Sequence, residues 1–210
     1  MRSFVVIALA ASTLVAAQAA DAAIVKRHDR SGRVVTFDVR VPGVHVGWYA
    51  AVLRRAIHGD EIETARIRIV SPTRIARLCN GTDTRGCYDG DEKGGVLIIP
   101  ARRSGMAAHV LLHEYAHHID MARSNFLHTS IPWAPSWWAA RGVKTALARG
   151  RMSLTYSLGW ERSVGEIFAE DYVQLNLRSR YAIRWLEPPN AAVKAALRRD
   201  LRAHVVSTGR

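Results

Sequence analysis

The sequence predicts an α+β fold in which strands come first and helices follow. Apolar and polar residues alternate in several short stretches of the first half, whereas helical spacing of apolar residues dominates the second half. Hydrophobic residues make up 49% of the 210 positions. This length and composition suit one domain with a substantial core, and no repeat period divides the sequence.

The beginning of the sequence has the pattern of an export signal. A basic residue precedes an apolar run, residues 4–17, and an Ala-Gln-Ala cleavage site follows it. The run is too short to span a bilayer comfortably, and the small residues after it oppose a membrane anchor. We expect a signal peptide at residues 1–19 and a single domain at residues 20–210. The mature protein would be secreted or periplasmic, with no transmembrane segment.

Short strands alternate with helices in the first half. Period-two alternation predicts the strands, and apolar residues three or four apart predict the helices. The expected strands are residues 33–41, 65–70 and 95–99, and the expected helices are residues 47–57 and 104–123. Ser104 is a suitable N-cap for the second helix.

The Gly- and Asp-rich stretch at residues 79–94 is expected to be a loop. It contains both cysteines, Cys79 and Cys87. Export would place them in an oxidising compartment, so we expect a disulfide that closes this loop. A pair of free thiols is the alternative; metal binding is not expected, because no second cysteine pair follows.

The second half is expected to be helical. A Trp-rich stretch with Trp133, Trp137 and Trp138 leads into a helix that ends near residue 149. A further helix is expected at residues 163–177, and a last one after two prolines, with Asn190 as its cap.

The segment His113-Glu114-Tyr115-Ala116-His117 has the spacing of a zinc site. Its two histidines are four residues apart on an expected helix, so both imidazoles leave one face, as a single tetrahedral Zn²⁺ requires. Glu114 lies about 100° around the helix from His113, where its carboxylate can reach a zinc-bound water as general base.

Other polar residues of the same helix are weaker candidates. His109 and Asp120 share the face of the two histidines. Asp120 can orient a ligating histidine or pair with Arg123, and His109 is an alternative ligand. His118 points elsewhere, toward the surface or into packing.

A third ligand is expected on the helix at residues 163–177. No third histidine stands at the spacing that extended zinc motifs use, so a carboxylate is the better candidate. Glu166 and Glu170 lie four residues apart on one face. Ser163 and Glu166 also form a capping-box pattern, which would turn Glu166 back to the helix start and leave Glu170 as the ligand.

Residues 113–120 and 157–172 together resemble the catalytic domain of anthrax lethal factor and the Pro-Pro endopeptidases. The resemblance implies a zincin-like domain with a small N-terminal sheet, an active-site helix and C-terminal helices. It also implies that Glu166 binds zinc and that Glu170 supports the site. In that family a tyrosine before the later helix stabilises the oxyanion; here Trp160 stands at that position, which leaves Tyr156 or His128 for the role.

The expected function is that of an exported zinc metalloendopeptidase acting on peptides or proteins. The substrate would lie extended along residues 96–99, and the tryptophans would pack in the core rather than form a subsite. One alternative is a zinc amide hydrolase acting on cell-wall peptides. The other is a catalytically silent zinc-fold binding protein, which the intact Glu114 opposes.

The chain is strongly basic, with a formal net charge of +12 and a pI of about 10.6. Such a charge favours anionic partners, for example a cell-envelope surface. The arginines are scattered along the sequence, so we interpret them as serving adhesion or solubility. Nucleic acid is not expected as a partner, because the export signal opposes it.

Overall fold

The computed structural model describes residues 22–91, 93–124 and 133–203; the expected signal peptide and His128 lie outside these ranges. The fold is α+β, as expected. Its mixed sheet has the strand order β1-β2-β3-β5-β4, in which β2, β3 and β5 are parallel and the edge strands β1 and β4 are antiparallel to their neighbours. The strands are β1 (Ala23–His28), β2 (Val34–Val39), β3 (Ala65–Val70), β4 (Cys87–Asp91) and β5 (Gly94–Pro100).

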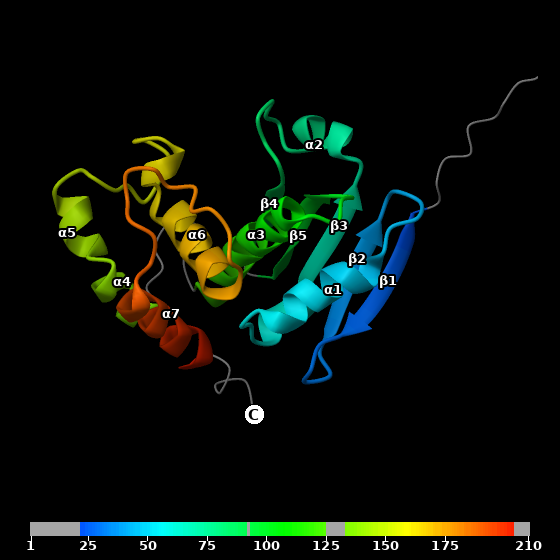
Figure 1. Cartoon of the computed structure of the whole chain (residues 1–210), viewed down its shortest axis with the longest axis horizontal. Coiled ribbons are helices and arrows are strands. Elements are labelled where there is room, and N and C mark those ends of the chain that lie inside the picture. The colour runs from blue at the N-terminus through cyan, green and yellow to red at the C-terminus, as the bar shows by residue number, and fades with distance from the viewer. Residues whose placement is uncertain (1–21, 92, 125–132, 204–210) are drawn as a thin grey trace, which may run out of the picture.

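Helix α3 (Gly105–Arg123) lies between the sheet and the helices of the second half of the chain. Figure 1 shows the sheet on one side of α3 and the helices α4 to α7 on the other. The helices are α1 (Val46–Arg55), α2 (Pro72–Leu78), α3 (Gly105–Arg123), α4 (Pro135–Ala140), α5 (Val143–Ala148), α6 (Val164–Asn176) and α7 (Ala191–Ala203), with 3-10 turns η1 (Asp60–Glu63) and η2 (Trp160–Arg162).

Helix α3 is the centre of the main hydrophobic core. Leu111, Tyr115 and Ile119 are fully buried, and the helix contacts both the sheet and α6. A helix that is apolar on several sides is stable only when other elements cover it. The polar side chains of α3 are therefore held in a rigid setting between two layers.

Several sequence predictions are confirmed. Ser104 caps α3 by accepting a hydrogen bond from Ala107 N at 3.2 Å, and Asn190 Oδ1 accepts one from Val193 N at 3.0 Å. Cys79 and Cys87 form a disulfide with their Cα atoms 5.8 Å apart.

The tryptophans also lie where the sequence predicts. Trp133 and Trp137 are buried in the core, and Trp138 is partly buried against it. Trp137 Nε1 donates to Asp171 Oδ2 at 2.8 Å, which satisfies the only polar atom of its side chain.

Besides the 3-10 turns, three elements were not expected: β1, α2 and β4. Strand β4 lies within the stretch that was expected to be a loop. Its Gly- and Asp-containing sequence has low β-propensity, so the sequence pattern does not indicate a strand there. Pairing with β5 and the disulfide at Cys87 hold it extended. The single helix expected before residue 149 is two helices, because Gly142, at φ 64°, separates α4 from α5.

The expectation that a substrate lies along residues 96–99 is wrong. Strand β5 is paired on both sides, with β3 and with β4, so it has no free edge. The edge strand on this side of the sheet is β4. Within the described ranges no helix combines the length and the apolar character needed to cross a membrane.

Candidate metal centre

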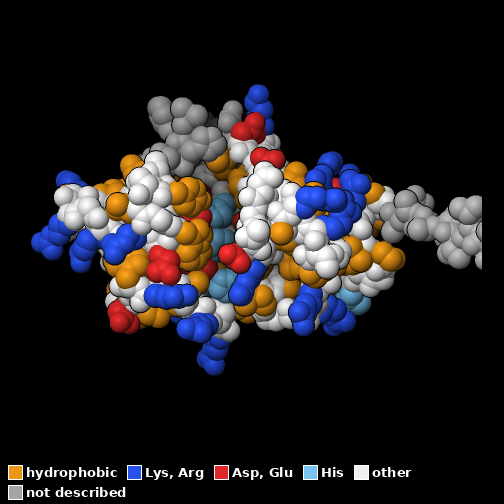
Figure 2. Space-filling model, turned by 90° about the horizontal axis from the view of Figure 1, so that it is seen from above, with side chains coloured by type: hydrophobic (Ala, Val, Ile, Leu, Met, Phe, Trp, Pro, Cys, Tyr) orange, Lys and Arg blue, Asp and Glu red, His pale blue; other side chains and the backbone are white. Residues whose placement is uncertain are grey.

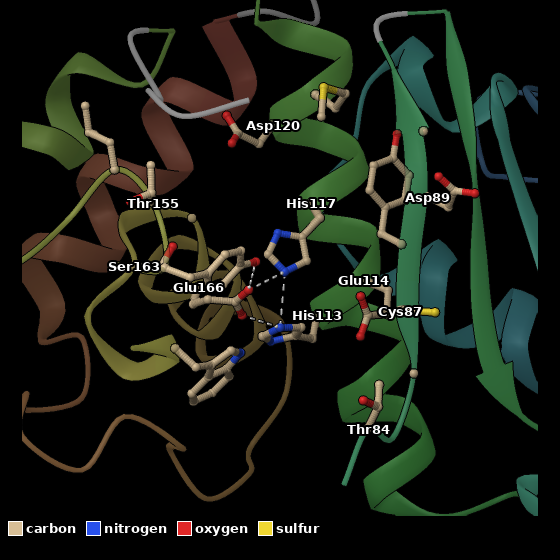
Figure 3. Close-up of a pocket in the computed structure, with 18 residues that line it drawn as sticks. Thr84, Cys87, Asp89, His113, Glu114, His117, Asp120, Thr155, Ser163 and Glu166 are labelled. Atoms are coloured by element: carbon tan, nitrogen blue, oxygen red, sulfur yellow. Dashed lines mark hydrogen bonds and ion pairs between the residues drawn. The ribbon is translucent and has the colours of Figure 1, made fainter. Parts of the chain in front are cut away.

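Helix α3 brings His113 and His117 together as the sequence predicts. Their Nε2 atoms are 3.3 Å apart, and their ring planes are inclined at 80°. His113 is buried and His117 partly so. Figure 3 shows both rings turned toward Glu166, which comes from α6.

Glu166 completes a group of three donor residues. Its Oε2 lies 3.0 Å from His113 Nε2, and its Oε1 lies 3.5 Å from His117 Nε2. Ser163 occupies the N-cap position of α6 but makes no side-chain cap hydrogen bond. The capping-box alternative is therefore wrong, and the Glu166 carboxylate faces the histidines instead.

Glu170 lies one helical turn further along α6, on the other side of the His113 ring. Its Oε1 is 3.0 Å from His113 Nδ1 and 2.9 Å from His109 Nε2, and its Oε2 accepts a hydrogen bond from Ala182 N at 3.1 Å. Glu170 therefore does not join Glu166 and His117 in one group. It hydrogen-bonds the His113 ring at Nδ1, the nitrogen that does not face Glu166. It also hydrogen-bonds the His109 ring at Nε2.

The hydrogen bond to Glu170 decides which nitrogen of His113 is free. An ionised carboxylate only accepts, so Nδ1 of His113 carries the proton that it donates to Glu170. In the neutral ring, Nε2 then carries no proton, and its lone pair faces the carboxylate of Glu166. Two lone pairs that face each other favour a cation between them, which is how an outer carboxylate prepares a histidine for metal.

The three donor residues match the demands of zinc. Ligand atoms at about 2.0–2.1 Å in a tetrahedral site lie roughly 3.3–3.4 Å from one another. The separations of 3.3, 3.0 and 3.5 Å come close to that value. Two imidazoles and one carboxylate, all held by neighbouring elements, make a donor set that fits Zn²⁺.

The electrostatics of the centre favour positive charge. Burial opposes protonation of His113, but hydrogen bonds to Glu166 and Glu170 outweigh burial and hold the pKa of His113 well above its usual value. The pKa of His117 is also raised, since the nearby Glu166 outweighs the effect of burial. The same potential that attracts protons to these rings would attract a divalent cation.

Glu114 is buried, and Figure 3 shows it beside the two histidines, on the side opposite Glu166. Burial in a region of low dielectric raises the pKa of its carboxyl group. A carboxylate with a raised pKa is a stronger base, which suits a residue that accepts a proton from water.

Two aromatic residues near the start of α6 lie over the centre. The hydroxyl of Tyr156 donates to Glu166 Oε1 at 2.7 Å, although 63% of the residue is exposed. The indole of Trp160 lies 6.1 Å from the His113 ring at an angle of 24°. The hydroxyl of Tyr156 therefore reaches the centre.

Of the weaker candidates on α3, Asp120 takes a structural role, whereas His109 belongs, with His113 and Glu170, to a second group whose donor atoms could hold a metal ion. Asp120 accepts hydrogen bonds from Trp133 Nε1 at 2.9 Å and from Ser124 Oγ at 3.3 Å, so it orients no ligand in the described part of the chain. Burial raises the pKa of Asp120 to about 6. Arg123 pairs with Glu61 at 3.1 Å, which makes the expected pairing with Asp120 wrong.

The centre lies at the junction of two adjoining cavities. They measure about 650 and 930 Å³, and Figure 2 shows the resulting groove with histidines at its floor. Both cavities are bordered by the same five residues, namely Thr84, Gly86, His113, Glu114 and Trp160. Residues of β4 and the segment before it form one wall, and the start of α6 with its preceding turn forms part of the other.

The sequence did not predict that β4 and Gly86, which directly precedes it, border the site. A Cβ atom at Gly86 would lie 2.4 Å from Val110 Cγ1, 2.9 Å from Ile98 O and 3.4 Å from Glu114 Oε1. Only a residue without a side chain lets this wall approach α3 so closely. A glycine in a Gly-rich loop gives no sign of this in the sequence, because the contact partners are distant residues.

Gly86→Ala is accordingly expected to push the start of β4 away from α3. We expect a loss of about 1–3 kcal/mol in the free energy of unfolding, the usual cost of overpacking. Thermal or chemical unfolding measures it. Gly105→Ala is the matched control, because a Cβ atom there meets nothing within 4 Å; equal stability of both variants would contradict this packing.

Comparisons of the chain with protein-family models, with curated proteins and with solved structures find no match.

Proposed function

We propose that the protein is a zinc-dependent metallopeptidase with a zincin-like fold, in which His113, His117 and Glu166 bind the metal. The observation that carries the proposal is the convergence of these three donors at 3.0–3.5 Å beside the buried Glu114. The α+β architecture, with a helix carrying the histidines against the sheet and a carboxylate from a later helix, supports the resemblance seen in the sequence.

The division of labour follows from the geometry. When bound, zinc supplies a Lewis acid that polarises the scissile carbonyl and makes a water molecule more acidic. Glu114 takes a proton from the attacking water and later delivers it to the leaving nitrogen. Glu170 keeps the His113 ring in one orientation throughout.

The substrate backbone would pair with β4. This strand is the sheet edge beside the centre, and its residues border the cavity that contains His117 and Glu166. An extended peptide can add to such an edge through main-chain hydrogen bonds, which serve many side-chain sequences. The edge strand thus takes the role first expected of residues 96–99.

Tyr156 is proposed to stabilise the oxyanion. Its hydroxyl already points at the centre through Glu166, and a donor there can bond the charge that develops on the carbonyl oxygen. Tyr156→Phe removes the hydroxyl and keeps the ring. We expect kcat to fall roughly 10²–10³-fold with zinc content unchanged. Unchanged hydrolysis rates would move the oxyanion role to another donor.

The same machinery serves any peptide-like amide, so a zinc amide hydrolase of cell-wall peptides is the second candidate. The net charge of +12 favours it, because it would draw the protein to an anionic envelope. The disulfide between Cys79 and Cys87 supports secreted or periplasmic action, since such bonds persist in oxidising compartments.

The direct test is the zinc content of protein purified without its first nineteen residues. About one zinc per chain and metal-dependent cleavage of a complex peptide mixture, followed by mass spectrometry, would support the proposal. A chain that takes up no zinc even after incubation with the metal would refute it and favour a binding protein. Zinc uptake with cleavage of cell-wall peptides alone would favour the second candidate.

A further inference from the structure

The two cavities beside the metal centre differ in charge. Away from the centre, the cavity along β4 is bordered by Asp89 and Asp120, and among the described residues by no lysine or arginine. The second cavity is bordered by three arginines, namely Arg85, Arg180 and Arg184. In Figure 2, Lys and Arg side chains lie on both sides of the groove that holds the histidines.

Two of these arginines form no ion pair with an acidic residue in the described part of the chain. Arg184 lies 3.6 Å from Glu161, which partly neutralises it. Arg85 donates to the sulfur of Met106 at 3.1 Å, a contact that leaves its charge uncompensated. Within the described residues no carboxylate forms an ion pair with Arg85 or Arg180, and both side chains belong to exposed residues that border the cavity.

The acidic residues of the second cavity do not cancel this charge. Glu170 is held by His109 and His113. Apart from Glu114 and Glu170, Asp83 and Glu161 are its only carboxylates among the described residues, against three guanidinium groups. Away from the metal centre, guanidinium groups thus outnumber carboxylates in this cavity, and guanidinium groups bind carboxylates.

The direction of β4 tells which part of a substrate would enter the second cavity. The segment before β4, including Arg85 and Gly86, borders this cavity, whereas β4 itself borders the other one. Antiparallel pairs are the commoner arrangement in sheets. A peptide paired antiparallel to β4 runs toward Gly86, so its residues after the scissile bond enter the second cavity.

We propose that the second cavity binds a carboxylate of the substrate on the C-terminal side of the scissile bond, through Arg85 and Arg180. The proposal rests on the proposed peptidase function and names its substrate class. The carboxylate can belong to an Asp or Glu side chain near the cleaved bond or to the C-terminus of a short peptide. Both sources present the same group to a guanidinium fork.

Inhibitor binding tests the proposal without requiring a turnover substrate. The probes are succinyl hydroxamates, whose chelating group takes the position of the scissile bond and whose peptide extends on its C-terminal side. Three probes differ only at the end: Asp-amide, Asn-amide and Asn with a free carboxylate. Their affinities are measured on zinc-loaded wild type, on Arg85→Gln/Arg180→Gln, and on the charge-matched control Arg77→Gln/Arg178→Gln, whose exposed arginines border neither cavity.

We expect at least one of the two acidic probes to bind wild type and the control about tenfold more tightly than Asn-amide. This preference should disappear in Arg85→Gln/Arg180→Gln and weaken with salt. Preference for Asp-amide identifies a side chain as the source, and preference for the free carboxylate identifies a peptide C-terminus. Equal binding of all three probes, or a preference that survives in Arg85→Gln/Arg180→Gln, overturns this inference alone. If zinc is bound and no probe binds, the peptidase proposal fails as well.

Discussion

Glu166→Gln is expected to abolish stable zinc binding, whereas Glu170→Gln is expected only to weaken it. Glu166 faces both Nε2 atoms of the centre, but Glu170 contacts His113 at Nδ1, on the far side of the ring. Loss of an outer partner costs roughly 10–100-fold in metal affinity, and loss of one of three ligands should cost more. Zinc affinity of both variants, measured by competition with a chelator, checks the order.

The two variants form a matched pair, because each replaces one buried carboxylate of α6 by its isosteric amide. Circular dichroism should show the same helix content in both, so that a difference in zinc affinity reports the site and not the fold. If Glu170→Gln lost more affinity than Glu166→Gln, Glu170 would be the ligand, and the donor group of His113, His117 and Glu166 would be wrong.

Glu114→Gln is expected to lower kcat by roughly 10²–10⁴-fold while zinc content stays at the wild-type level. The amide keeps the size of the side chain but cannot accept a proton from water. Glu114 is buried beside the histidines yet is not one of the three donors, so the metal should remain. Hydrolysis of the best substrate found in a peptide mixture, together with zinc content, checks both halves of the prediction.

A carboxylate outside the groove provides the control. Glu187→Gln removes an exposed acid that borders neither cavity, and its rate should match that of wild type. Loss of zinc in Glu114→Gln would show that Glu114 helps to hold the metal. Full activity with zinc retained would remove it from the proton transfer and leave the mechanism without its base.

The groove combines a main-chain binding edge that would accept many substrate sequences with charged side chains that would select among them. Main-chain pairing with β4 would accept many sequences, whereas charged residues at one end of the groove discriminate by complementarity. A narrow requirement for a carboxylate would make the protein inactive on most test peptides even when its metal centre is intact. Zinc content is for this reason a better first measurement than activity.

Features that depend on local spacing could be predicted from the sequence. The four-residue interval between His113 and His117 fixes both rings on one helix face, and the capping residues Ser104 and Asn190 mark where two helices begin. The alternation at residues 65–70 coincides with strand β3, and the separation of the cysteines allows their disulfide. Each of these depends on the geometry of a few consecutive residues.

Which residues meet across the fold depends on tertiary packing. Both Glu166 and Glu170 lie on the same face of α6, and only the packing of α6 against α3 assigns one to each side of the His113 ring. Strand β4 has a sequence of low β-propensity. Because it pairs with β5, β4 occupies the sheet edge that residues 96–99 were expected to form. Arg85 and Arg180 are far apart in the chain and border one cavity. These arrangements depend on contacts between distant segments, whose free energy no local pattern contains.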